Sequence, residues 1–315
     1  AFGLPTMPAE LSLYSLSFID RILIARKLGL AEAGLYALSV KMTQGIAVLV
    51  RGFQLAFPPL AYSIEDDEEA RLAYSAVVTW FVTLMALVVG FLWLIAPWIV
   101  RVFAAPEFFD AADAVGPVSA GAALYALYMV LLVVLGRTGQ TKYNLPATVA
   151  GLVANIGLNL LLLPIWGIIG AGVSLVISYL IVVVLMYLFT QRLFPVPYEW
   201  LRLARVLLVT AALIAVGEVF VPGDGIAWLV VRLLLVASFP FVLLLTGFFS
   251  AEERGWLMLL TQPGALKEKL LEARRAGERA GEGAAGGGIG EEGKPGRRGL
   301  PEAIEVEQWD EDLRS

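Results

Sequence analysis

The sequence predicts an all-α polytopic membrane protein with about eight transmembrane helices. Hydrophobic residues make up 59% of the 315 residues and charged residues only 16%, whereas soluble domains carry about 25% charged residues. The apolar residues also gather in long runs, and about 20 residues of helix suffice to cross a hydrocarbon core about 30 Å thick. These observations argue against a soluble enzyme.

Charged residues, prolines and glycines divide the apolar sequence into successive runs. The runs cover residues 8–25, 33–60, 72–96, 115–135, 145–163, 168–189, 203–221 and 226–248. The first run is interrupted by Glu10, Asp20 and Arg21, whereas only residues 164–167 separate the fifth from the sixth. Because the proline and glycine in this short separator are typical of turns, we expect a helical hairpin there.

The residue types that the chain lacks narrow its chemistry. It contains no cysteine and no histidine, which removes disulfides, thiolate nucleophiles, imidazole bases and the usual zinc ligand sets. Its net charge of -5 does not indicate a nucleic-acid surface. Residues 136–142 look like a phosphate-binding loop but lack its spacing and follow an apolar helix. We therefore expect no enzyme activity, catalytic residue, metal, cofactor or nucleic-acid partner.

Lysine and arginine are distributed unequally between alternate connections. One set of connections contains Arg71, Arg137, Lys142, Arg192, Arg202, Arg205 and Arg254, and the other contains only Arg26, Lys27 and Arg101. Because cytoplasmic loops carry the excess of basic residues, both ends of this chain are predicted to be cytoplasmic.

Three regions are predicted from the distribution of apolar and charged residues. Residues 1–250 form the transmembrane region, and residues 251–276 form a cytoplasmic amphipathic helix whose basic residues lie next to anionic lipid. Residues 277–315 hold too few apolar side chains to offset the entropy of ordering, which predicts a disordered cytoplasmic tail. The chain opens close to an apolar helix, and this start suggests the C-terminal part of a longer protein.

Polar residues inside the second predicted span indicate a hydrated cavity. In one continuous helix, Lys41, Gln44 and Arg51 fall within an arc of about 80°. Such a face is expected to line water rather than lipid. Two cations about 15 Å apart along the helix suit an elongated anion such as a diphosphate. The alternative is that Lys41 and Arg51 snorkel, or pair with carboxylates elsewhere in a longer protein.

The first predicted span carries an adjacent acid and base, Asp20 and Arg21. Their side chains point about 100° apart, so they form no salt bridge within the helix. One hypothesis places Arg21 in the cationic cavity and gives Asp20 a coupling proton or sodium ion. The alternative is an interface anchor, with Arg21 snorkelling outward. Glu218 and Arg232, in the last two spans, are expected to form a structural pair.

Helix packing explains three further residues in the fifth and sixth predicted spans. Asn155 and Asn159 are four residues apart, so both amides face one neighbouring helix and can form hydrogen bonds across the interface. Gly170 lies in a stretch of small residues that allows the sixth helix to approach its partner closely.

Two ordered groups of short motifs carry a family resemblance. The first comprises Gly3-Leu4-Pro5, Asp20-Arg21, Ala31-Glu32-Ala33-Gly34-Leu35-Tyr36 and Pro58-Pro59-Leu60-Ala61-Tyr62. The second comprises Thr141-Lys142, Asn155, Asn159, residues 160–164, Gly167-Ile168-Ile169-Gly170-Ala171-Gly172 and Ser178-Tyr179, flanked by Glu107-Phe108 and by Ala251-Glu252-Glu253-Arg254. Together these motifs resemble polysaccharide flippases of the Wzx type, over about residues 3–255.

The resemblance implies the multidrug/oligosaccharidyl-lipid/polysaccharide (MOP) exporter fold, in which two six-helix lobes face a central cavity. This chain would supply the second lobe and two extra helices of a MATE-like exporter, in the bacterial cytoplasmic membrane. The family implies outward flipping of undecaprenyl-diphosphate-linked oligosaccharide, with Arg21, Lys41 and Arg51 at positions compatible with holding the diphosphate. The implied partners are this lipid-linked substrate, the N-terminal lobe, membrane lipids and glycan-assembly proteins.

Other functions fit the same composition. A related exporter for drugs or lipid II differs mainly in its cargo. A membrane-embedded glycan polymerase, ligase or glycosyltransferase belongs to a different class and needs a large catalytic outer loop, for which the connections leave little room. A scaffold in a glycan-assembly complex would use the charged tail to bind its partners.

Overall fold

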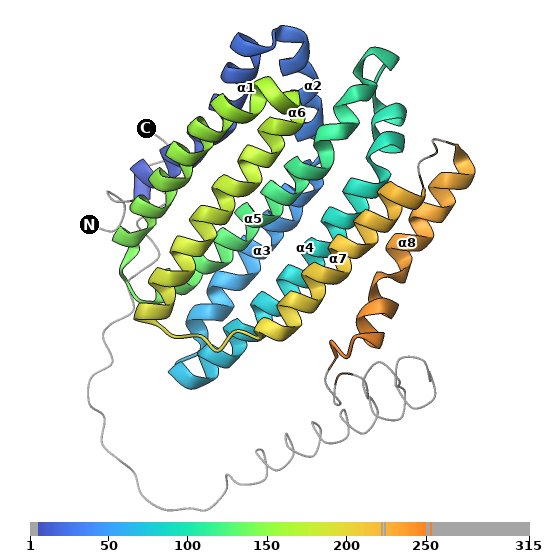
Figure 1. Cartoon of the computed structure of the whole chain (residues 1–315). Coiled ribbons are helices and arrows are strands. Elements are labelled where there is room, and N and C mark those ends of the chain that lie inside the picture. The colour runs from blue at the N-terminus through green and yellow to red at the C-terminus, as the bar shows by residue number, and fades with distance from the viewer. Residues whose placement is uncertain (1–5, 222, 224, 250–252, 254–315) are drawn as a thin grey trace, which may run out of the picture. The chain divides into compact units, whose positions relative to one another are not determined.

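The computed structural model describes residues 6–221, 223, 225–249 and 253, and this part of the chain is almost entirely helical (Figure 1). The α-helices are α1 (Thr6–Lys27), α2 (Leu30–Met42), α3 (Gln44–Ser63), α4 (Asp67–Phe103), α5 (Ala112–Arg137), α6 (Asn144–Leu193), α7 (Trp200–Phe220) and α8 (Ile226–Leu245). Two short 3₁₀ turns, η1 (Pro106–Ala111) and η2 (Thr141–Tyr143), precede α5 and α6 respectively. The regions predicted at 251–276 and 277–315 lie outside the described residues, apart from Glu253.

The predicted fold class, an all-α multi-pass membrane protein, is confirmed. Within the described residues, 6 helical segments are long and apolar enough to cross a membrane. The longest of them, Thr141–Leu193, folds back at Gly167 and therefore contains two of the predicted spans. The first predicted span corresponds to α1, which is not among these segments. The second corresponds to α2 followed by α3, of which α3 is among them, so each predicted run has a helical counterpart.

Gly167 turns α6 into the hairpin that the sequence predicts. Its backbone has φ 55° and ψ -138°, a conformation that only glycine adopts without strain. The two arms of α6 then pack closely. A Cβ atom added to Gly151 would collide with Val182, and one added to Gly170 would collide with Leu162. The close approach at Gly170 is therefore between these two arms.

The prediction of one continuous helix over residues 33–60 is wrong, because the chain breaks at Thr43 between α2 and α3. Thr43 has φ -86° and ψ 0°, and its hydroxyl donates to the carbonyl of Val40 at 2.8 Å. The hydroxyl thus competes for a carbonyl that a continuous helix would use. Gly45, a weak helix former, follows directly. The arc that places Lys41 and Arg51 on one helix face assumes a continuous helix, so it does not apply to this structure.

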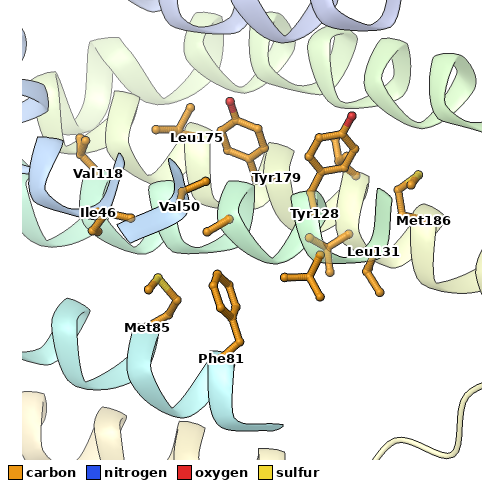
Figure 2. Close-up of a cluster of buried hydrophobic side chains, with 14 of the residues drawn as sticks. Ile46, Val50, Phe81, Met85, Val118, Tyr128, Leu131, Leu175, Tyr179 and Met186 are labelled. Carbon is orange, nitrogen blue, oxygen red and sulfur yellow. The ribbon is translucent and has the colours of Figure 1, made fainter. Parts of the chain in front are cut away.

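Helix α5 packs between α4 and α6 at the centre of the bundle, and α1 packs against α6. Figure 2 shows aliphatic and aromatic side chains of this core, including Ile46, Met85 and Leu131. Lipid is as apolar as these side chains, so close van der Waals packing, rather than exclusion of water, holds the helices together.

Two arginines, Arg232, which is buried, and Arg137, which is half-buried, join the ends of the helices. Arg232 of α8 donates to the carbonyls of Leu94 at 2.9 Å and Val221 at 2.8 Å, and its guanidinium lies 3.5 Å from Glu218. The predicted Glu218–Arg232 pair is therefore confirmed, and it fastens α7 and α8 to α4. Arg137 at the end of α5 donates to the carbonyl of Ile64 and to the carboxylate of Asp67, both at 2.8 Å.

We predict that Gly167→Ala destabilises the hairpin by about 1–3 kcal/mol, because alanine is strained at this backbone conformation. Gly157→Ala is the matched control, since Gly157 lies in the same element with no atom near its missing Cβ. This control should gain about 0.5–1 kcal/mol from helix propensity. Thermal unfolding in detergent measures both, and equal unfolding temperatures for the two variants would contradict the assigned turn.

Candidate functional site

A cavity of about 590 Å³ opens between α1, α2, α3, α5 and α6. Its polar lining comprises Asp20, Arg21, Tyr36, Thr43, Gln54, Tyr125, Tyr128 and Tyr179. Aliphatic side chains such as Val40, Val118 and Leu132 complete the wall. The cavity is therefore amphipathic, with an acid and a base beside a largely aromatic surface.

Asp20 is the buried acid of this cavity, with only 1% of its surface exposed. One carboxylate oxygen accepts a hydrogen bond from the Tyr36 hydroxyl at 3.1 Å, and the other accepts one from the Asn159 amide at 2.7 Å. These bonds join α1 to α2 and α6. A buried carboxylate is costly unless it is hydrogen-bonded, so this arrangement requires the three helices to stay in register.

Asn155 lies beside the same carboxylate but does not complete a hydrogen bond. Its side chain adjoins Asp20, is fully buried, and has neither its amide nitrogen nor its oxygen within hydrogen-bond geometry of a described residue. The side-chain oxygen of Asn159 is likewise unpaired. Buried polar atoms are rarely left unsatisfied. Amide and carboxylate oxygens are hard ligands of the type that binds water or a small cation.

Arg21 provides the positive charge of the cavity. It lines the cavity next to Asp20, yet it forms no ion pair with any described residue. The prediction that adjacent residues on one helix form no salt bridge is consistent with this geometry. The guanidinium is exposed and available to an anionic group.

Tyrosines form the aromatic wall opposite this charge. The ring of Tyr125 lies 6.1 Å from that of Tyr128 and 5.5 Å from that of Tyr179. Figure 2 shows the rings of Tyr128 and Tyr179 among the core side chains, with both hydroxyls pointing to the same side. Tyrosine offers an apolar face and a polar tip. The wall is thus suited to amphiphilic molecules and to sugar rings.

The structure separates the cationic residues that the sequence placed together. Arg21 lines the cavity, whereas Lys41 lines a different hollow with Phe103 and Phe108. Gln44 and Arg51 are exposed on α3 and line neither of these two spaces. The helix ends at Met42 and begins again at Gln44, so Lys41 and Arg51 do not belong to one continuous helix, and Arg21 comes from α1.

Sequence reasoning missed the aromatic wall. Tyr125 and Tyr128 are three residues apart on one helix, which was a usable signal. Tyr36 and Tyr179 come from distant helices, and only the fold brings them to the cavity. Asn155 and Asn159 were interpreted as packing residues, and the hydrogen bond from Asn159 to Asp20 does cross between helices.

Comparison with known proteins supports this architecture. Among solved structures, the chain is similar to one described as the lipid II flippase MurJ in an inward closed conformation, with 15% sequence identity and a TM-score of 0.50. The similarity covers 82% of this chain and 57% of that one, so the chain spans little more than half the length of the solved structure. The fold of this chain is therefore similar to that of the matched part of MurJ.

Residues 1–113 match the family described as "Polysaccharide biosynthesis protein". The resemblance inferred from the sequence motifs is confirmed over this region, which contains α1 to α4 and both charged residues of the cavity. A comparison with curated proteins gives no match.

We predict unequal effects for the two asparagines. Asn159→Leu should destabilise the protein by about 1–3 kcal/mol, because it leaves a buried carboxylate oxygen without its donor. Asn155→Leu should be nearly neutral in a buffer that contains only bulky organic cations, since Asn155 makes no hydrogen bond to a described residue. Thermal unfolding of both variants tests this asymmetry, and equal losses would favour a purely structural pair.

Proposed function

We propose that this chain is the second lobe of a flippase that carries undecaprenyl-diphosphate-linked oligosaccharide outward across the bacterial cytoplasmic membrane. The single observation that supports this function most strongly is the cavity that joins Arg21 to a tyrosine wall inside an exporter fold. The matched family description, polysaccharide biosynthesis, agrees with such a substrate. The function requires no covalent chemistry.

Each part of the substrate has a counterpart in this proposal. Arg21 holds the diphosphate by charge-assisted hydrogen bonds, and Tyr125, the half-buried tyrosine of the wall, stacks against a sugar ring. Lys41, Gln44 and Arg51 lie outside the cavity along the same pair of helices, and they receive the diphosphate at later positions on its path. Binding to successive cations suits an anion that must move.

The membrane potential can assist this transport. Moving a negative charge outward across an inside-negative membrane is favoured by about 2.3 kcal/mol per charge per 100 mV. With both ends of the chain in the cytoplasm, as the distribution of basic residues favours, the connections that carry Arg71, Arg137 and Arg202 face the side on which the substrate is made. The N-terminal lobe of the same protein would close the other side of the cavity.

A second candidate function is export of lipid II or of a drug, and the fold similarity to a lipid II flippase favours it. Lipid II and oligosaccharide carriers share a polyprenyl diphosphate, so Arg21 would serve both. A polymerase or glycosyltransferase has less support, because no large catalytic loop connects the described helices. Transport assays with each lipid separate the two cargoes.

We predict that Arg21→Gln lowers flipping of a fluorescent undecaprenyl-diphosphate-linked oligosaccharide at least tenfold in liposomes containing the full-length transporter. The expected cause is loss of the cation that holds the diphosphate. Lys27→Gln is the control, because Lys27 is exposed at the end of α1 and lines no described cavity. Quenching of fluorescence from the outside measures flipping. Equal rates for both variants and the wild type would argue against the proposal.

We further propose that Asp20, with the oxygens of Asn155 and Asn159, binds the coupling ion, a proton or sodium. The unpaired oxygens beside a buried carboxylate support this role. Exchange of an ion at this site would change the bonds that join α1, α2 and α6, and would thereby couple ion movement to rearrangement of the lobe.

We predict that Asp20→Asn abolishes the response of transport to an imposed ion gradient while potential-driven flipping persists. Sodium should raise the unfolding temperature of the wild type relative to an organic cation at equal ionic strength, and Asn155→Leu should remove that shift. A response to a pH gradient without a sodium shift would identify the proton as the ion. Unchanged gradient responses in Asp20→Asn would exclude Asp20 from coupling.

A further inference from the structure

A second hollow lies between α2 and the connection from α4 to α5. Its volume is about 340 Å³, and it shares no lining residue with the cavity described above. Small residues such as Gly34 and Ala37 form its floor, and Phe103, Phe108 and Lys41 are its large side chains. Among the described residues, Lys41 is therefore the one charged residue that lines this otherwise apolar hollow.

The ammonium of Lys41 has no protein partner within the described part of the chain. Lys41 is exposed and makes no hydrogen bond or ion pair there. The hollow itself contains no carboxylate. A cation without a protein partner next to an apolar surface can bind an amphiphilic anion, whose charged group contacts the cation while its apolar group covers the surface.

The hollow lies at the level where membrane helices end. Helix α4 ends at Phe103 and α5 begins at Ala112, and the Ser39 hydroxyl of α2 donates to the carbonyl of Ala111 at 2.6 Å. Figure 1 shows the α1–α2 turn and the α4–α5 connection at the same end of the helices. Lysine side chains at such a level reach lipid headgroups. Lys41 thus lies near lipid phosphates rather than at mid-membrane.

The aromatic residues of the hollow are open to the surroundings. Phe103 is 73% exposed and Phe108 is 37% exposed. Gly34 has no side chain, which leaves space beside Phe108 that even a Cβ atom would narrow, since it would lie 3.9 Å from the Phe108 ring. This shape leaves a slot along the helices that a single hydrocarbon chain can occupy.

We propose that this hollow binds an anionic phospholipid of the surrounding bilayer, with its phosphate at Lys41 and one acyl chain along Phe103 and Phe108. The charge selects an anionic headgroup, and the apolar slot selects a lipid over a soluble anion. The site shares no lining residue with the substrate cavity, but it rests on the proposed function in one respect, because Lys41 is also proposed to meet the diphosphate later on its path.

The test uses the full-length transporter purified in detergent and titrated with phosphatidylglycerol or phosphatidylcholine. Native mass spectrometry counts the bound lipids, and thermal unfolding reports the stabilisation. Wild-type protein should retain phosphatidylglycerol at least fivefold more tightly than phosphatidylcholine. Lys41→Gln should remove this preference, and Ala37→Phe should reduce binding of both lipids by filling the slot. Lys27→Gln, a charge change outside the hollow, should bind as the wild type does.

Three results would overturn the proposal. The first is equal retention of phosphatidylglycerol by the wild type and Lys41→Gln. The second is complete displacement of the lipid by inorganic phosphate, which would make Lys41 a site for soluble anions. The third is protection of Ala37→Cys from a membrane-soluble thiol reagent in lipid-free protein, which would show that protein covers the hollow. Arg21→Gln changes the substrate cavity and leaves the hollow intact, so it tests flipping separately, and failure of the lipid proposal is distinguishable from failure of the flippase proposal.

Discussion

The lipid bilayer offers no hydrogen bonds, so every polar group of this chain within the hydrocarbon must find its partner inside the protein. Helices meet this requirement for most of the backbone, and side chains meet it where the helices end. Arg232 donates hydrogen bonds to the carbonyls of Leu94 and Val221. Arg137 donates hydrogen bonds to those of Ala61 and Ile64. These charged side chains are therefore structural. They also join helices that have little other reason to associate in an apolar solvent.

The same requirement explains the hydrogen bonds that Asp20 accepts from Tyr36 and Asn159. A carboxylate can remain buried there only because Tyr36 and Asn159 donate to it, and this places three helices under one constraint. Asn155 departs from the pattern, since its polar atoms are unsatisfied among the described residues. The proposed ion site rests on this unpaired amide beside a buried carboxylate, since buried polar atoms usually have a partner.

Two cationic residues lie in different environments, because Arg21 belongs to α1 and Lys41 belongs to α2. Arg21 faces a tyrosine-walled cavity, and Lys41 stands at a shallow apolar hollow near the ends of α4 and α5. The proposed transport of an amphiphilic anion needs contacts of both kinds, one with the polar cargo and one with the bilayer. The two hollows share no lining residue, so the two proposed contacts lie on separate surfaces.

The sequence by itself determined the all-α membrane fold, the hairpin at Gly167 and the Glu218–Arg232 pair, because these follow from local composition, spacing and the cost of charge in lipid. Only the tertiary structure decided that Thr43 interrupts a helix, since a single hydroxyl competing for the carbonyl of Val40 is a small local preference. It also brought Tyr36, Tyr179 and Asn159 to Asp20 or its cavity, since residues far apart in sequence meet only through helix packing.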